Sequence, residues 1–253
     1  MPRASRYLLE GYTYHLTHRC HDRRFLLKFR EERDAYREWL RIGVKRYGVS
    51  VYAYCITSNH THVVVYVHDR EAVARLMQLS AGAVAQALNR RKDQQNSVWE
   101  HPYQCTMVQD GAHLLHCLRY VDMNMVRAGK VRHPREWRWC GYDELTGQRN
   151  RYRILDVEGL GQRLGLPDTR TLFDLHGREV QEQIEHRLFA RQAHWTESLA
   201  VGSQDFVIAA ESLHDKRRQF TTYPVGNGLT TDTWAVREGS ADYSAGSASK
   251  VMI

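Results

Sequence analysis

The order of apolar periodicities along the first half of the chain constrains its fold most strongly. Alternation over residues 11–18 predicts a strand, and apolar positions at helical spacing from Glu31 to Tyr47 predict a helix that Gly48 closes. Two runs rich in β-branched and aromatic residues, 49–56 and 62–67, flank a turn-like segment and predict a hairpin. The chain therefore begins with a strand, a helix and two further strands.

A second helix is predicted next. Its apolar positions run from Val73 to Leu88, and residues 103–108 predict a fourth strand. A third helix is expected over residues 112–128. The order β-α-β-β-α-β predicts an α+β fold, a ferredoxin-like split βαβ sandwich with one helix added after it.

The rest of the chain has a different character. Two helical patterns, at 179–193 and 204–219, predict a mostly helical extension over residues 148–224. From Val225 onward Gly, Ser, Thr and Asp dominate, which predicts a disordered tail over residues 225–253.

Charge is divided unequally between these parts. Residues 1–150 hold 24 Lys and Arg against 15 Asp and Glu, a net +9, and the remainder holds 12 against 14, a net −2. A basic excess of this kind is typical either of a surface that binds nucleic acid or of an ordinary solvated face. The five cysteines form no CxxC pair, so we expect reduced thiols. With no membrane span or signal peptide in the sequence, we expect a cytoplasmic protein.

Two short patterns carry possible chemistry. His60 and His62 are two residues apart at the start of a predicted strand, so both imidazoles should leave one face of the sheet, where they could share a metal ion. Tyr120 and Asn124 are four apart on the third predicted helix and should share one of its faces, with Arg127 nearby. Each pattern alone also fits a chance histidine pair or an ordinary half-buried tyrosine.

Taken together, these patterns resemble the single-tyrosine HUH transposases of the insertion-sequence type, and in particular the REP-associated tyrosine transposases. The stretches that carry the resemblance are 2–7, 14–20, 57–62, 99–103, 119–129 and 195–203. The sequence departs from the family pattern at two positions. Thr61 stands where a bulky hydrophobe is usual, and Met125 stands where a proline is usual.

The resemblance implies a role for each of these residues. Tyr120 would be the nucleophile, and His60, His62 and Asn124 would bind Mg²⁺ or Mn²⁺. Residues 1–147 would form the catalytic domain. DNA contacts are expected from basic and aromatic residues, namely Arg3, Arg6, His18, Arg19, Trp99, Tyr103 and Arg127. The alternative, which the residue types favour, is that Trp99 and Tyr103 cap the core.

The implied reaction is cleavage and transfer of single-stranded DNA at palindromic, REP-like hairpins beside a short guide sequence, through a 5′-phosphotyrosine intermediate. The resemblance favours a monomer, although related enzymes exchange the tyrosine helix within a dimer. Two other readings stay open. One is a replication-initiator or relaxase-like nickase, and the other is a non-catalytic nucleic-acid-binding protein with a ferredoxin-like fold.

Overall fold

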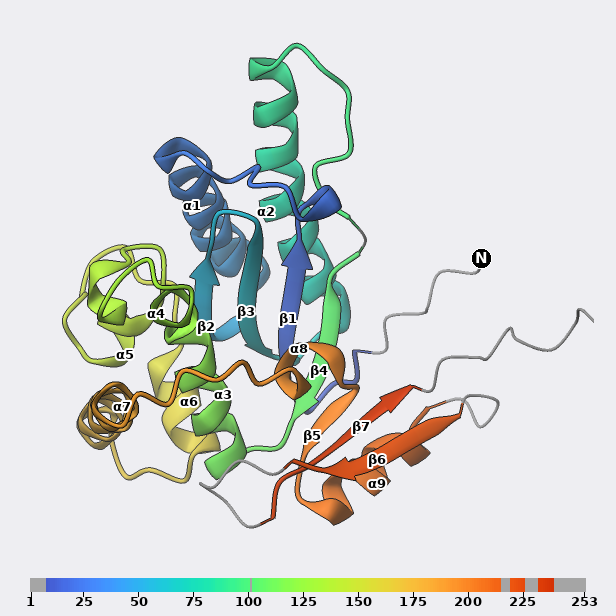
Figure 1. The fold of residues 1–253 in the computed structure, drawn as a ribbon, viewed down its shortest axis with the longest axis vertical. Helices are drawn as coiled ribbons and strands as arrows, with labels where there is room; N and C mark the ends of the chain where they lie inside the picture. Colours follow the sequence, from blue (N-terminus) through green and yellow to red (C-terminus); the bar gives the residue numbers. More distant parts are fainter. Residues whose placement is uncertain (1–7, 101, 215–218, 226–231, 239–253) are drawn as a thin grey trace, which may run out of the picture.

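The computed structural model describes residues 8–100, 102–214, 219–225 and 232–238. Its centre is a seven-stranded sheet with the order β2-β3-β1-β4-β5-β7-β6 (Figure 1). The strands are β1 (Thr13–Arg19), β2 (Ser50–Ile56), β3 (His60–Tyr66), β4 (Gln104–Val108), β5 (Ala200–Gly202), β6 (Phe220–Pro224) and β7 (Trp234–Glu238). The longer helices are α1 (Arg30–Tyr47), α2 (Arg70–Arg91), α3 (Ala112–Asp122), α7 (Thr169–Glu185) and α9 (Gln204–Ser212). The shorter helices are α4 (Asn124–Arg127), α5 (Tyr142–Leu145), α6 (Val157–Arg163) and α8 (His194–Glu197), with 3₁₀ turns at His21–Arg23 and Pro134–Glu136.

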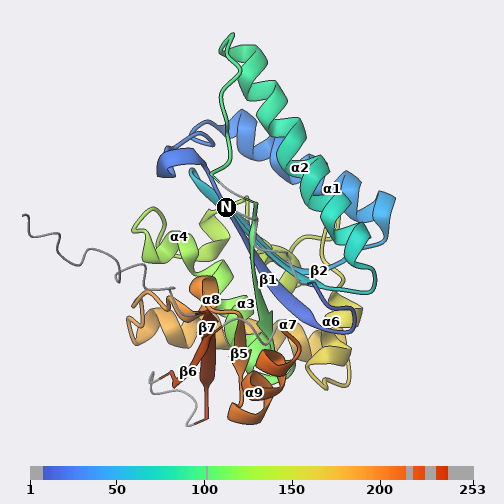
Figure 2. The same cartoon turned by 90° about the vertical axis from the view of Figure 1, so that its right-hand side faces the viewer.

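The first four strands confirm the predicted α+β fold. β1 lies between β3 and β4 and pairs antiparallel with both, and β2 pairs antiparallel with β3. This is the strand order of a split βαβ sandwich. Helices α1 and α2 cover one face of the sheet and α3 lies on the other (Figure 2). Gly48 ends α1 in the left-handed conformation, as predicted.

Strand alternation divides the residues of β1 and β3 between these two faces. Thr61 points toward α1, where it is fully buried and its hydroxyl donates to the Tyr36 hydroxyl at 3.2 Å. The polar residue in place of a bulky hydrophobe therefore has a partner. His15, Thr17 and His62 point to the opposite face, toward α3. One face of the sheet is thus an ordinary core, and the other carries the imidazoles.

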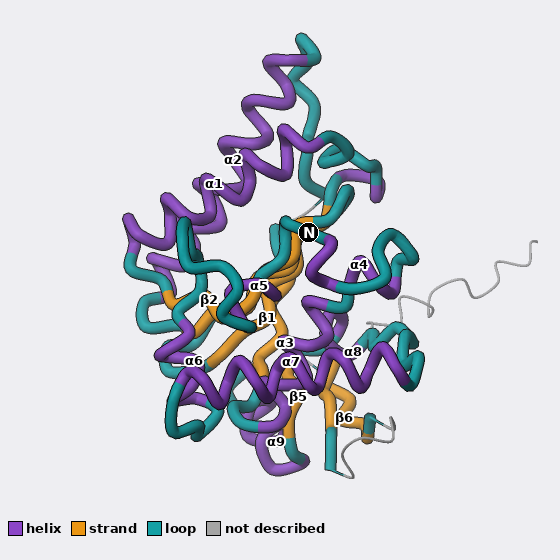
Figure 3. Tube along the Cα trace, turned by 90° about the vertical axis from the view of Figure 1, so that its left-hand side faces the viewer, coloured by secondary structure: helices purple, strands orange, loops and turns teal. Residues whose placement is uncertain are grey.

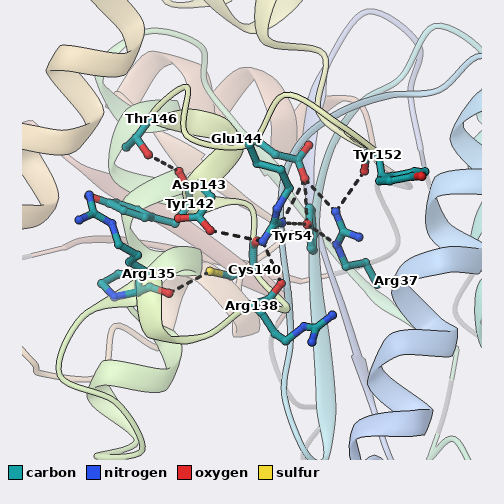
Figure 4. Close-up of polar contacts among 12 residues, drawn as sticks. Arg37, Tyr54, Arg135, Arg138, Cys140, Tyr142, Asp143, Glu144, Thr146 and Tyr152 are labelled. Carbon is teal, nitrogen blue, oxygen red and sulfur yellow. Dashed lines mark hydrogen bonds and ion pairs between the residues drawn. The ribbon is translucent and has the colours of Figure 1, made fainter.

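The segment after α3 and α4 protects the edge strand β2. Buried Glu144 accepts hydrogen bonds from the amides of Ile154 and Leu155 at 2.7 and 3.0 Å and from the Tyr54 hydroxyl at 2.9 Å. Arg37 and Arg149 pair with the same carboxylate, each at 3.5 Å (Figure 4 shows this cluster). The cluster fixes residues 139–156 along β2, which would otherwise expose unpaired backbone groups.

The extension differs in part from the sequence-based expectation. It contains α7 and α9, but α7 begins at Thr169, where Asp168 caps it by accepting from the Thr171 amide. It also contributes β5, β6 and β7 to the sheet (Figure 1). β5 has only three residues, all buried, so it shows no alternation, and its position depends on parallel pairing with β4.

The prediction of a disordered tail from Val225 is wrong for residues 234–238. They form β7, which pairs with both β5 and β6, and Ala235 and Val236 are fully buried. The polar composition of the neighbouring segments concealed this short strand. Residues 226–231 and 239–253 of the predicted tail lie outside the described residues.

Candidate active site

An open cleft of about 440 Å³ lies where β3 begins and α4 ends. The cleft brings together His60, His62, Tyr120, Asn124 and Arg127. The spacing placed each pair on one face of its own element, and the resemblance implied that the two pairs meet. The other residues that line the cleft are Thr17, Arg19, Arg23, Asn59, Ala128, Phe189, Arg191, Thr196 and Glu197. Four of these lie between residues 189 and 197, so the extension forms one wall of the cleft. In Figure 3, α8 and α4 lie on the same side of the view.

The two predicted histidines lie side by side at the start of β3. Their ring centroids are 4.7 Å apart. Burial lowers the pKa of His60 to about 4, and burial lowers the pKa of His62 well below its usual value. Both rings are therefore neutral at pH 7. A neutral imidazole has one nitrogen with a lone pair, and hydrogen bonds decide which nitrogen that is.

His60 has its proton on Nδ1. This atom lies 2.7 Å from Asn59 Oδ1, and the Asn59 amide is oriented by donating from Nδ2 to the Arg23 carbonyl at 3.2 Å. Because the side-chain oxygen can only accept, His60 Nδ1 must donate. The lone pair of His60 is consequently on Nε2.

His15 orients His62 in the same way, and the sequence patterns did not single it out. Its Nδ1 lies 2.7 Å from the Trp195 carbonyl, which can only accept, so Nδ1 carries the proton. Burial lowers the pKa of His15 to about 4, so its Nε2 has a lone pair. That atom lies 2.8 Å from His62 Nδ1, which must therefore donate. The chain of hydrogen bonds puts the lone pair of His62 on Nε2.

The predicted helix over residues 112–128 is divided at Met123, but its periodicity continues. The Met123 amide bonds the Arg119 carbonyl and the Arg127 amide bonds the Met123 carbonyl, both at 2.9 Å. Asn124 accordingly stays on the Tyr120 face, with its Nδ2 at 2.9 Å from His62 Nε2. The amide side chain thus contacts the nitrogen that has the free electron pair.

The residues of the cleft fit a divalent cation. Two Nε2 lone pairs and one amide side chain lie together, and rotation of the Asn124 amide would present its oxygen to a bound ion. Imidazole nitrogen and amide oxygen are both ligands of divalent cations. Among the residues that the structure describes, there is no group of three or more His, Cys, Asp or Glu side chains that could hold a metal ion. Any site here therefore requires Asn124 or the substrate to complete it.

Tyr120 is almost buried, and two guanidinium groups lie close to its phenol. Burial raises the pKa of Tyr120, whereas Arg127, Arg191 and a side-chain hydrogen bond with Thr196 lower it. Arg127 lies over the Tyr120 ring at 4.1 Å and donates to the Tyr120 carbonyl at 2.7 Å. The two arginines thus favour ionisation of Tyr120, but burial outweighs them.

The predicted DNA contacts separate into three groups. Arg19 and Arg127 line the cleft. His18, Trp99 and Tyr103 do not, because His18 points to the α2 face, where it stacks on Trp99 at 4.2 Å, and Tyr103 is buried. Arg3 and Arg6 lie outside the described residues.

Comparison with known proteins finds a family model and solved structures to which the chain is similar. Residues 9–124 match the family model of IS200-like transposases. Among solved structures, the chain is similar to the REP-associated tyrosine transposase bound to a REP hairpin. That likeness has 14% identity and a TM-score of 0.47, and it covers 58% of this chain and 87% of the other. A second is to a putative transposase from Deinococcus radiodurans R1, with 15% identity and a TM-score of 0.33, covering 51% and 98%.

No curated protein matches the chain. Cys20, Cys55, Cys117 and Cys140 are free thiols, as expected. Within the described ranges, no helix is long and apolar enough to cross a bilayer. The family match ends at Asn124 and so includes His60, His62, Tyr120 and Asn124. On this evidence, residues 9–124, which include the histidine pair, Tyr120 and Asn124, are similar to the IS200-like transposases.

Proposed function

We propose that this protein is a metal-dependent endonuclease and strand transferase for single-stranded DNA that acts through a 5′-phosphotyrosine intermediate on Tyr120. The observation that carries the proposal is the cleft itself. It holds the Tyr120 phenol beside His60, His62 and Asn124, which lie together although they come from two separate elements. We propose Mg²⁺ or Mn²⁺ as the cation and residues 1–147 as the catalytic domain.

In the proposed reaction Tyr120 attacks the phosphorus of a backbone phosphodiester. A bond forms between the phenolic oxygen and phosphorus, the bond from phosphorus to the 3′ oxygen breaks, and the phenolic proton is lost to solvent or to the leaving oxygen. The products are a 5′-phosphotyrosine linkage and a free 3′-OH. Since one phosphoester replaces another, a 3′-OH can reverse the step and thereby transfer the strand.

One group of residues would bind the cation, and a second group activates Tyr120. His60, His62 and Asn124 would hold the cation, which when bound supplies Lewis-acid stabilisation of charge on the scissile phosphate. Arg127 and Arg191 stabilise the phenolate of Tyr120, and the side-chain hydrogen bond with Thr196 acts in the same direction. Because burial raises the pKa of Tyr120, these positive charges are needed to generate the nucleophile near neutral pH.

The hairpin substrate with its guide sequence is the finer part of the proposal. It is supported by the sequence resemblance and by the net charge of +9 in residues 1–150, which favours a polyanion. A monomer is proposed on the sequence resemblance alone.

The test is the capture of a covalent product. Wild-type protein is incubated with Mn²⁺ and a library of single-stranded hairpins, denatured in detergent, and the attached DNA is sequenced. The Tyr120→Phe variant, which keeps the ring that packs beside Arg127, should form no adduct while it binds the same oligonucleotides. Tyr142→Phe is the matched control, since Tyr142 is a buried tyrosine outside the cleft. An adduct from Tyr120→Phe, or none from wild type, would refute the proposal and favour a non-catalytic binding protein.

A further inference from the structure

The segment between β1 and α1 carries two phenylalanines that the core does not use. Phe25 and Phe29 leave 64% and 54% of their surfaces exposed. Between them, Leu26 and Leu27 are buried and anchor the segment. An aromatic ring held in water by buried neighbours is available to stack on a partner ring.

Positive charge surrounds these rings. Residues 19–30 and 89–97 hold eight Lys and Arg against two Asp. Within the described residues, two of the eight are paired with carboxylates, Arg30 with Asp34 and Arg91 with Glu32. The other six are Arg19, Arg23, Arg24, Lys28, Arg90 and Lys92. The end of α2 and the 20–29 segment lie toward the same end of the molecule (Figures 1 and 2), so their charges act on one surface.

The segment is held rigidly in an unfavourable backbone conformation. Asp22 and Arg23 have φ values of 52° and 55°, in the left-handed region that side chains other than glycine rarely adopt. Two hydrogen bonds fix it to the β2–β3 turn, from the Leu27 amide to the Ser58 carbonyl at 2.9 Å and from Asn59 Nδ2 to the Arg23 carbonyl at 3.2 Å. Such conformations persist where the surroundings enforce them, and they are concentrated at binding sites.

The segment continues directly from the catalytic cleft. Arg23 lines the cleft, and Asn59, which bonds the Arg23 carbonyl, also accepts from His60 Nδ1. A strand that lies against His60 would therefore pass over Arg23 as it leaves. Phe25 comes two residues later, and in the described part of the chain no ring or cation packs on its face.

We infer that Arg23, Arg24, Phe25, Lys28 and Phe29, here called the strand platform, bind the single-stranded DNA that leaves the catalytic cleft. Phe25 stacks on one base, and the three cations lie along the phosphates. Phe29 keeps Lys28 and Arg91 in position, since both lie over its ring at 5.8 and 5.7 Å. Single-stranded DNA is favoured over a duplex because only unpaired bases offer an open face to an isolated ring. The inference rests on the proposed function, which makes single-stranded DNA the substrate in the cleft.

The test measures binding alone, so that cleavage does not enter. The Tyr120→Phe protein is titrated without metal into a fluorescein-labelled single-stranded oligonucleotide, and fluorescence anisotropy gives the Kd. In this background Phe25→Leu should weaken binding by about 5- to 100-fold, the effect of losing one stacked base. Phe25→Trp should retain the affinity. Ile208→Ala, at an apolar residue of α9 that is 52% exposed, is the matched control.

A second arm tests the charges. Arg24→Gln with Lys28→Gln should lower the slope of log K against log salt by about 1.4, because each phosphate contact on a single strand contributes about 0.7. Arg170→Gln with Arg178→Gln, on the exposed face of α7, should leave the slope unchanged. If the parent protein binds single-stranded DNA but Phe25→Leu binds equally well, or weakens blunt duplex binding to the same extent, the strand platform is refuted. If the parent protein binds no single-stranded DNA, the proposed function fails first.

Discussion

Replacing His15 by phenylalanine should test whether the extension sets the metal-binding form of His62. The substitution keeps a ring in a fully enclosed site but removes both ring nitrogens. The Trp195 carbonyl loses its donor, and His62 Nδ1 loses its acceptor. His62 Nδ1 then keeps only the contact with Thr17 Oγ1, which at 3.5 Å is too long to hold the proton firmly on Nδ1.

Two consequences follow, with different magnitudes. Leaving two buried polar groups without partners should lower the free energy of unfolding by about 2–4 kcal/mol. A domain with about 5–15 kcal/mol of stability should still fold. Losing the group that orients a metal-binding histidine should weaken metal affinity by about 10- to 100-fold.

Three measurements on metal-free protein separate these consequences. Urea unfolding gives the stability, titration calorimetry with Mn²⁺ gives the affinity, and ¹⁵N NMR of the imidazoles reports which nitrogen of His62 carries the proton. His133→Phe is the matched control, because it removes a half-buried imidazole outside the cleft. It should reduce stability slightly and leave Mn²⁺ affinity unchanged. A folded His15→Phe protein that binds Mn²⁺ like wild type, or a wild-type His62 protonated on Nε2, would refute the hydrogen-bond argument.

Three other predictions follow from buried groups. Glu144→Ala should lower the free energy of unfolding by about 3–5 kcal/mol, because Arg37 and Arg149 lose a buried carboxylate; urea denaturation checks this, and a loss below about 1 kcal/mol would contradict it. Burial lowers the pKa of His15 and of His60 to about 4, so the unfolded chain binds more protons between pH 6.5 and 4. Stability should therefore fall as pH decreases through that range, and an unchanged urea midpoint between pH 7 and 5 would argue against neutral buried imidazoles. Burial raises the pKa of Tyr120, so single-turnover cleavage should accelerate from pH 7 to 9 as phenolate forms; a rate that is flat over this range would show that another step limits it.

The sequence by itself determined the elements whose pattern is local. Alternation and helical spacing predicted the β-α-β-β-α-β order, and the two-residue spacing placed His60 and His62 on one face. The four-residue spacing placed Tyr120 with Asn124, and it held through the break at Met123 because the backbone hydrogen bonds continue there. These features depend on the geometry of one strand or one helix, which the chain specifies without reference to distant residues.

Only the tertiary structure decided what depends on partners far apart in the chain. His15 acquired its role because β1 pairs with β3 and because Trp195, 180 residues later, presents its carbonyl to Nδ1. β5 and β7 are too short for a periodic signal, and they became strands because β4 offered an unpaired edge. His18 was placed away from the cleft by the single-residue alternation that put Thr17 into it. Hydrogen-bond partners and strand register are properties of the assembled sheet, so local sequence patterns could not reveal them.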